Sequence, residues 1–163
     1  MVEPPSFETL IGTTLGNYRL EQLIEPSEVA PVFLATGSSA GAKYRLRILL
    51  IPADLSSEQR IVYLGRLQQE AKSISALHHP SILPLLDYGN ANGMPYLVSS
   101  QSPMKPLNTE LAQGPMDLIR ISRYLDAIAA ALEHAHEHAV LHRNLSTDRI
   151  FIKDGNLVVT DFG

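Results

Sequence analysis

The chain has 163 residues, 45% hydrophobic and 18% charged, which is typical of a globular domain with a buried core rather than of a disordered segment. A formal net charge of −4 argues against a nucleic-acid-binding surface, and the lack of cysteine excludes a disulfide framework, a thiolate metal site and a thiol nucleophile. The N-terminus lacks signal-peptide features and no apolar run approaches the roughly 18 residues of a membrane span, so we expect a soluble, cytoplasmic domain without a membrane segment.

The first part of the chain is predicted to consist mainly of short strands. Residues 1–17 are polar and punctuated by proline and glycine, so we expect a flexible leader there. A turn without glycine is predicted over 25–31, and a polar turn of small residues over 37–42. Apolar runs that predict strands lie at 18–24, 32–36, 44–51, 82–89 and 95–100.

One long helix is predicted to interrupt these strands. Ser56 and Gln59 have the spacing of a capping box, which marks a helix start. Apolar residues then recur every three or four positions, and the pattern ends before His79 and Pro80. The amphipathic face predicted by this pattern consists of Ile61, Leu64, Leu67, Ala71, Ile74 and Leu77.

A breaker-rich connection over 101–106 is predicted to separate two lobes. A second long helix is predicted over 117–138, because apolar residues again recur at helical spacing. Its apolar stripe consists of Leu118, Ile121, Leu125, Ile128, Leu132 and Ala135.

The last two dozen residues are predicted to form a loop and a hairpin. Apolar strands at 150–152 and 157–159 flank Asp154-Gly155, a dipeptide typical of tight hairpin turns. Such a hairpin would bring polar residues before it, His142 to Asn144, towards Asp161 after it. The order of strands, helix, strands, helix and hairpin predicts an α+β fold.

Two motifs here resemble those of eukaryotic-type Ser/Thr protein kinases, especially the bacterial branch. The family carries H-R-D-L-x-x-x-N and then D-F-G. This chain keeps the second motif intact at 161–163, whereas the first begins His142-Arg143-Asn144. The run from Gly12 to Leu20 is also similar to the opening of many bacterial kinase domains.

The resemblance implies the fold and the division of the chain. Residues 18–100 would form a kinase-like small lobe, with a five-stranded antiparallel sheet and one long helix. Residues 101–163 would form the hinge and the first part of the helical large lobe. Because later large-lobe segments of the family would follow Gly163, we expect the chain to be a fragment.

At the catalytic positions implied by the resemblance, two residues depart from the family. Asn144 replaces the catalytic Asp, and an amide cannot act as the base, whose contribution is about 10²–10⁴-fold. Arg149 replaces the second metal-binding Asn, which places a cation where Mg²⁺ prefers oxygen donors. Asp161 is retained, either as a single metal ligand or as a residue that hydrogen-bonds its own loop.

The family's phosphate-binding loop is also altered. With Val32 as the anchor, its three glycines correspond to Glu25, Ser27 and Ala30. Glycines allow backbone amides to approach phosphates closely. Their loss, together with the negative charge of Glu25, argues against phosphate binding and favours an ordinary turn between strands.

The resemblance implies four further nucleotide-binding positions. Arg45 replaces the small residue above adenine, and would block that pocket if its side chain pointed inward. Arg47 replaces the phosphate-binding Lys, which is not a conservative change at an ionic site. Glu70 either pairs with Arg47, holding the helix without nucleotide, or is a solvated helix charge. Ser100 begins the hinge, which would bind nucleotide through backbone groups.

Histidines recur at four-residue spacing in His134, His138 and His142, which could chelate zinc on a helix. The H-E-x-x-H pattern of metalloproteases fails because Val140 stands at its second histidine position. The other interpretation is a helix end whose histidines serve in packing.

These observations favour a catalytically inactive kinase-like domain, a pseudokinase, that acts as a regulatory or protein-binding module. One alternative is a weak or unconventional phosphotransferase, which would use ATP and Mg²⁺; the leading hypothesis requires no cofactor. Another is a truncated reading frame without independent function. The stripe on helix 117–138 predicts an exposed apolar patch for a protein partner or a missing downstream kinase segment.

Overall fold

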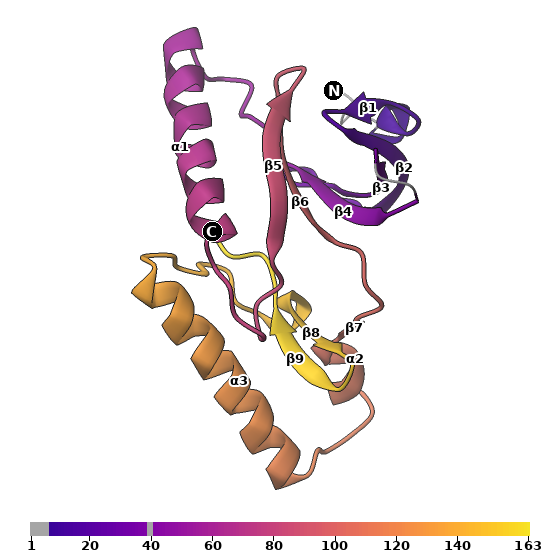
Figure 1. Ribbon diagram of the computed structural model, residues 1–163, viewed down its shortest axis with the longest axis vertical. Helices are drawn as coiled ribbons and strands as arrows, with labels where there is room; N and C mark the ends of the chain where they lie inside the picture. Colours follow the sequence, from indigo (N-terminus) through magenta and orange to yellow (C-terminus); the bar gives the residue numbers. More distant parts are fainter. Residues whose placement is uncertain (1–6, 39–40) are drawn as a thin grey trace. The chain divides into compact units, whose positions relative to one another are not determined.

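Figure 1 shows the computed structural model of the chain, which describes residues 7–38 and 41–163. The first six residues of the predicted leader, and two residues of the turn predicted over 37–42, lie outside the described residues. The chain divides into two compact units. The first consists of Met1–Ala71 and Leu85–Gln101, and the second of Lys72–Pro84 and Ser102–Gly163.

The first unit is built on an antiparallel sheet. Among the described residues its strands follow the order β1-β2-β3-β4-β6-β5, and every neighbouring pair is antiparallel. A short 3₁₀ helix, η1, precedes the sheet (Figure 1). The bounds are η1 Phe7–Leu10, β1 Thr14–Leu15, β2 Tyr18–Glu25, β3 Val32–Gly37, β4 Lys43–Ile48, β5 Leu85–Ala91 and β6 Met94–Ser100.

The flexible leader predicted over 1–17 is wrong for its described part. In addition to η1, this segment contributes β1, whose Leu15 is buried and pairs with Tyr18. Because β1 adds an edge strand, the sheet has six strands within the described residues, rather than the five expected from the resemblance. The sequence offered little signal for a strand of only two residues.

Aromatic rings fill the centre of the first unit. Tyr18 lies edge-on to Tyr44 and Tyr96, with ring centroids 5.3 and 6.1 Å away, and its hydroxyl donates to Asp87 Oδ2 at 2.8 Å. Burial, and then the hydrogen bond to Asp87, raises the pKa of the Tyr18 hydroxyl. These rings pack with a buried apolar cluster of Leu15, Leu20, Phe33, Ala35, Leu46, Ile48 and Val98.

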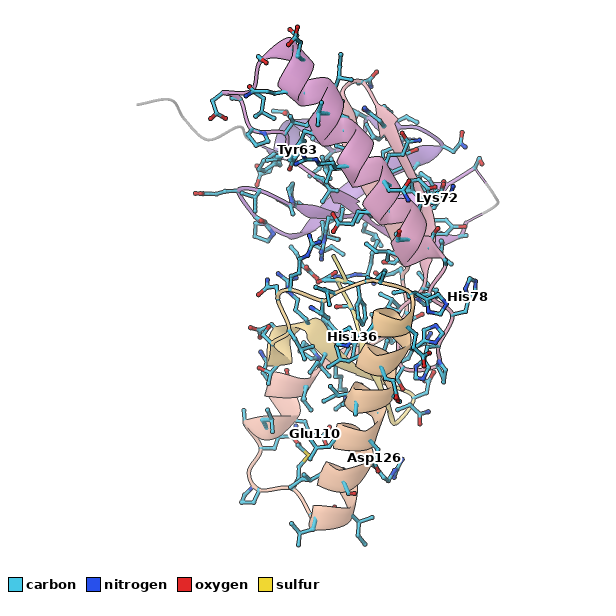
Figure 2. All side chains as sticks on the ribbon, turned by 90° about the vertical axis from the view of Figure 1, so that its left-hand side faces the viewer. Tyr63, Lys72, His78, Glu110, Asp126 and His136 are labelled. Carbon is cyan, nitrogen blue, oxygen red and sulfur yellow. The ribbon has the colours of Figure 1, made fainter. Side chains whose placement is uncertain are left out.

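Helix α1 (Ser57–Ser75) begins as predicted. The Ser56 amide donates to Gln59 Oε1 at 2.9 Å, and the Gln59 amide donates to Ser56 Oγ at 3.2 Å, which confirms the capping box. Ala71 and Ile74 are buried, but Ile61 is 72% exposed, so the predicted buried face is wrong at its start. Figure 2 labels Tyr63 and Lys72 along this helix.

The second unit combines a small sheet with helix α3, which packs against β9 (Figure 1). Its strands lie in the order β7-β8-β9 in the part of the chain that the structure describes. The elements are β7 Lys105–Pro106, α2 Leu107–Leu111, α3 Leu118–Glu137, η2 Thr147–Arg149, β8 Ile150–Lys153 and β9 Asn156–Val159.

The predicted hairpin is confirmed. Lys153 pairs with Asn156, and both turn residues between them have positive φ, 51° for Asp154 and 78° for Gly155. This conformation is that of a type I′ turn, which matches the twist of the two strands.

The strand predicted over 82–89 begins three residues late, at Leu85. Ile82 instead forms a parallel bridge to Val159, and the Leu83 amide donates to the Val159 carbonyl at 2.9 Å. The apolar run therefore serves two sheets, one in each unit, which periodicity alone cannot reveal.

Helix α3 buries one face and exposes its neighbour. Its amino end is capped by Asp117, whose side chain accepts from the Arg120 amide at 2.9 Å. Tyr124, Ala131 and Ala135 are buried. Leu118 is 82% exposed and Leu125 60% exposed, so the apolar stripe is wider than the surface that covers it within the described residues. No helix within 7–38 and 41–163 combines the length and apolar character that a transmembrane segment requires.

Candidate functional site

The register of the β8–β9 hairpin brings together the two charged residues predicted at the metal site. Ile150 pairs with Val159, so Arg149 just before β8 lies opposite the residues just after β9. The Thr160 amide and hydroxyl both donate to the Arg149 carbonyl, at 2.9 and 3.1 Å. Asp161 follows directly. Hydrogen bonds to Thr160, the neighbour of Asp161 in the chain, therefore hold the backbone of Arg149 close to Asp161.

The side chains of Arg149 and Asp161 form an ion pair. Arg149 Nη1 lies 2.6 Å from Asp161 Oδ2, and the side chains are 33% and 22% exposed. The Asp161 backbone has φ of 62°, in the left-handed region that side chains rarely adopt. A charge-assisted hydrogen bond of this length is among the stronger polar contacts in proteins. One oxygen of the Asp161 carboxylate, for which metal binding was one of two interpretations, thus already faces a cation.

A buried histidine ties the loop before the hairpin to the segment after it. His142 is 4% exposed, and its Nε2 lies 2.7 Å from the Thr160 carbonyl oxygen, so this nitrogen carries the donated proton. Its ring lies 4.8 Å from that of Phe162, measured between centroids. The Gly163 amide also donates to the Leu141 carbonyl. No sequence pattern points to Thr160, although it anchors both Arg149 and His142.

Asn144, at the catalytic-base position of the resemblance, belongs to the same loop. Its backbone amide donates to the His142 backbone carbonyl at 2.7 Å, and its side chain is exposed. The preceding residue, Arg143, has φ of 60°. Asn144, Arg149 and Asp161, the three predicted catalytic positions, thus all lie in the second unit. Asp161, the acidic residue among them, is paired with Arg149.

In the first unit, the turn at the phosphate-loop position is closed on itself. Ser27 Oγ accepts hydrogen bonds from the amides of Ala30, at 3.1 Å, and Val29, at 3.3 Å. Glu25 forms an ion pair with Arg45, whose side chain is 17% exposed. Two amides that a phosphate could have used are therefore already bonded, and a carboxylate holds the Arg45 guanidinium.

The remaining predicted nucleotide positions lie on the sheet and on α1. Val32 is 2% exposed and pairs with Glu25 on β2 and Arg47 on β4. Ser100 ends β6 opposite Tyr44. The ion pair expected between Arg47 and Glu70 stays a prediction.

Three histidines of the second unit are stacked. The His134 ring lies 5.4 Å from that of His79 and 4.5 Å from that of His138. His134 Nε2 is buried without a hydrogen-bond partner, whereas His79 Nδ1 accepts from the Ser81 amide at 3.0 Å. Burial, and then the charge of His134, lowers the pKa of His79. The helical spacing of histidines in the sequence gives no sign of His79, because His79 joins the others only through tertiary packing.

Zinc does not fit this stack. Nowhere in the described ranges do three or more His, Asp or Glu side chains lie in positions that could hold a metal ion. His142, one of the three histidines whose spacing left zinc chelation open, bonds a backbone carbonyl. Figure 2 labels His136 near the carboxyl end of α3, where it is exposed.

The fold and the hairpin motifs define a kinase-type α+β chain. In agreement, the sequence matches the protein kinase domain family over residues 21–163, and the chain belongs to this family. It is 29% identical over 157 residues to the serine/threonine-protein kinase PrkC of Bacillus subtilis. It is 31% identical over 161 residues to the serine/threonine-protein kinase PknA of Mycobacterium tuberculosis.

These similarities cover 94% of this chain, but only 24% of PrkC and 36% of PknA. Among solved structures, the PknI kinase domain of M. tuberculosis superposes with a TM-score of 0.77 at 21% identity, covering 93% of this chain and 60% of that one. The structural similarity therefore supports the kinase-like fold, and the sequence similarity supports the bacterial Ser/Thr kinase branch.

Proposed function

We propose that this domain is a pseudokinase: it does not transfer phosphate, and acts as a regulatory or protein-binding module of a cytoplasmic signalling protein. The observation that carries the proposal is the closed turn over 25–31. Phosphate loops work by presenting unpaired backbone amides to anionic oxygens. Here Ser27 Oγ accepts hydrogen bonds from two such amides, and the neighbouring Glu25 carboxylate is held in an ion pair with Arg45.

The exposed Asn144 supports the same proposal. Phosphoryl transfer depends on positioning and on charge stabilisation, with one carboxylate orienting the attacking hydroxyl. An amide can accept a hydrogen bond from that hydroxyl but cannot take its proton. Any remaining transfer would be slower by about 10²–10⁴-fold, the usual contribution of a general base.

The second candidate is a weak or unconventional Ser/Thr phosphotransferase with ATP and Mg²⁺ as cofactors. It is favoured by the retained Asp161, and by Arg47 on β4, which keeps a positive charge at the Lys position. In this candidate, Glu70 would orient Arg47 and Ser100 would contribute hinge backbone. It requires Asp161 to leave Arg149.

As a binding module, the domain would use the exposed part of the α3 stripe. Leu118 and Leu125 are seven positions apart, so they lie on one face of the helix. We propose that a protein partner, or a kinase segment following Gly163, covers this face.

The test is thermal unfolding of the full-length protein with 1 mM ATP, with and without Mg²⁺. A site with a Kd of about 10 μM would contribute about 2.7 kcal/mol, raising Tm by roughly 5–10 °C. We expect no rise in the wild type. As a matched comparison, the Glu25→Gly/Ser27→Gly/Ala30→Gly variant carries the loop glycines of the family, and its Tm should rise with ATP. A clear rise in the wild type would favour the phosphotransferase instead.

A further inference from the structure

We infer that the Arg149 guanidinium is a built-in cation that replaces Mg²⁺ at Asp161, so that the Asp161 segment holds its conformation without metal. The inference deepens the proposed function and rests on it for its meaning, because a metal-independent domain is of use only to a module that does not transfer phosphate. It concerns different residues from the closed turn that carries that proposal.

The backbone makes this ion pair local and pre-organised. Arg149 is held by two hydrogen bonds from Thr160, the residue next to Asp161. Little chain entropy is therefore lost when the side chains meet. Both side chains are at least two-thirds removed from solvent, which weakens screening of the pair relative to a fully exposed one.

Mg²⁺ does not fit these residues. The ion demands near-octahedral oxygen coordination at about 2.0–2.1 Å and is usually held by one or two carboxylates. Here Asp161 Oδ2 is bonded to a guanidinium nitrogen at 2.6 Å. A divalent ion would have to displace this group or bind beside its positive charge.

The first test measures metal binding directly, with Mn²⁺ as the probe because oxygen ligands suit both Mn²⁺ and Mg²⁺. Free Mn²⁺ is followed by electron paramagnetic resonance during titration of the full-length protein. We expect Arg149→Asn, which supplies the amide typical of the family, to bind one Mn²⁺ at least tenfold more tightly than the wild type.

Two further variants make that result specific. The gain should disappear in Arg149→Asn/Asp161→Asn, because the carboxylate is gone. Arg123→Gln removes the same charge from an exposed position on α3 and should gain nothing. The inference is overturned when the wild type binds Mn²⁺ as tightly as Arg149→Asn, or when the gain survives the loss of Asp161.

The second test needs no metal. Melting temperatures are compared for the wild type, Arg149→Asn, Asp161→Asn and the double variant in the presence of a chelator. If the two side chains act as a pair, the double variant should lose no more than the worse single variant. Additive losses would contradict the pairing. Arg149→Lys, which keeps the charge, should recover part of the melting temperature without any gain in Mn²⁺ affinity.

The two proposals can fail separately. ATP binding by the wild type without Mn²⁺ binding overturns the closed-turn argument that carries the proposed function, and leaves the built-in cation standing. Tight Mn²⁺ binding by the wild type, without ATP binding, overturns the built-in cation and leaves the proposed function standing.

Discussion

At the carboxyl end of α3, Ala139 occupies a position that usually belongs to glycine. The Val140 amide donates to the Ala135 carbonyl, and the Ala139 amide to the His136 carbonyl, both at 2.9 Å. This pattern is a Schellman motif, and its left-handed residue is Ala139, with φ of 58°. A Cβ at such a position costs roughly 1–2 kcal/mol.

Ala139→Gly should therefore stabilise the protein by about 1 kcal/mol, seen as a rise of roughly 2–4 °C in Tm by calorimetry. The matched control is Ala129→Gly, an exposed position inside α3, which should lose about 1 kcal/mol because glycine lowers helix propensity. A loss in both variants would show that relief of the left-handed Ala is not the dominant effect at 139.

A second residue-scale prediction concerns His79. Burial and the charge of His134 lower its pKa from the ordinary value of 6.5, so the unfolded chain binds this proton more readily. The stability that His79 contributes is complete above pH 6.5 and is lost as pH falls towards the lowered pKa. We expect His79→Asn, whose amide oxygen can still accept from Ser81, to show a smaller fall in Tm between pH 7 and 5.

The control for this pH effect is His136→Asn, because His136 is exposed and outside the stack. Its pH profile should follow the wild type. If His79→Asn and the wild type lose equal stability on acidification, the histidine stack is not the source of the acid sensitivity.

At the scale of elements, the start of α1 offers a clean test of capping. Ser56→Ala removes the hydroxyl that accepts the Gln59 amide, and should cost about 1 kcal/mol, within the usual range for a lost cap. Ser57→Ala, one residue further on, should be neutral or slightly stabilising, since alanine is the better helix former. Chemical denaturation curves of the two variants give the comparison. Equal effects would argue against the capping box as a source of stability.

The exposed apolar residues of α3 are expected to affect self-association rather than stability. Because Leu118 is 82% and Leu125 60% exposed, Leu118→Gln/Leu125→Gln should leave Tm within about 1 °C of the wild type, as surface changes usually do. The same variant should reduce self-association in sedimentation experiments, because an exposed apolar patch favours association. A Tm loss of the size seen for core substitutions would mean that these side chains are buried in the folded protein.

Elements with strong local signals could be predicted from the sequence. Asp154-Gly155 and its apolar flanks were enough for the hairpin, and Ser56 with Gln59 was enough for the start of α1. The short β1 and the shared run over 82–89 could not be predicted, because their pairing depends on distant strands. The Glu25–Arg45 ion pair was missed for the same reason, since it joins β2 to β4 across β3, and the β2–β3 register has irregularities.

In the candidate site, too, local patterns could be predicted from the sequence, whereas long-range contacts could not. The hairpin pattern predicted that polar residues 142–144 would approach Asp161. His142 bonds the preceding residue, Thr160, whereas the side chain that contacts Asp161 is that of Arg149. The anchoring role of Thr160 needed the register itself, and the stack of His79 on α3 needed tertiary structure. Residue identities thus predicted which positions depart from the family, whereas the geometry revealed which internal partners lie there.

At the scale of the whole molecule, each compact unit has an internal ion pair at a position that the resemblance to kinases would assign to a ligand. In the first unit, Arg45 pairs with Glu25 and Ser27 accepts two amides. In the second, Arg149 pairs with Asp161. The family membership is shown over residues 21–163, while the chain spans about a quarter to a third of its curated bacterial relatives. A kinase fold whose charges are internally paired is the physical basis of the proposed loss of transfer.

The most direct measurement is transfer of labelled γ-phosphate from ATP, with Mg²⁺, to the full-length protein itself and to a general protein substrate. If the domain is a pseudokinase, incorporation should be no greater in the wild type than in Asp161→Ala. Incorporation that requires Mg²⁺ and disappears in Asp161→Ala would contradict it, because Asp161 would then be bound to metal rather than to Arg149.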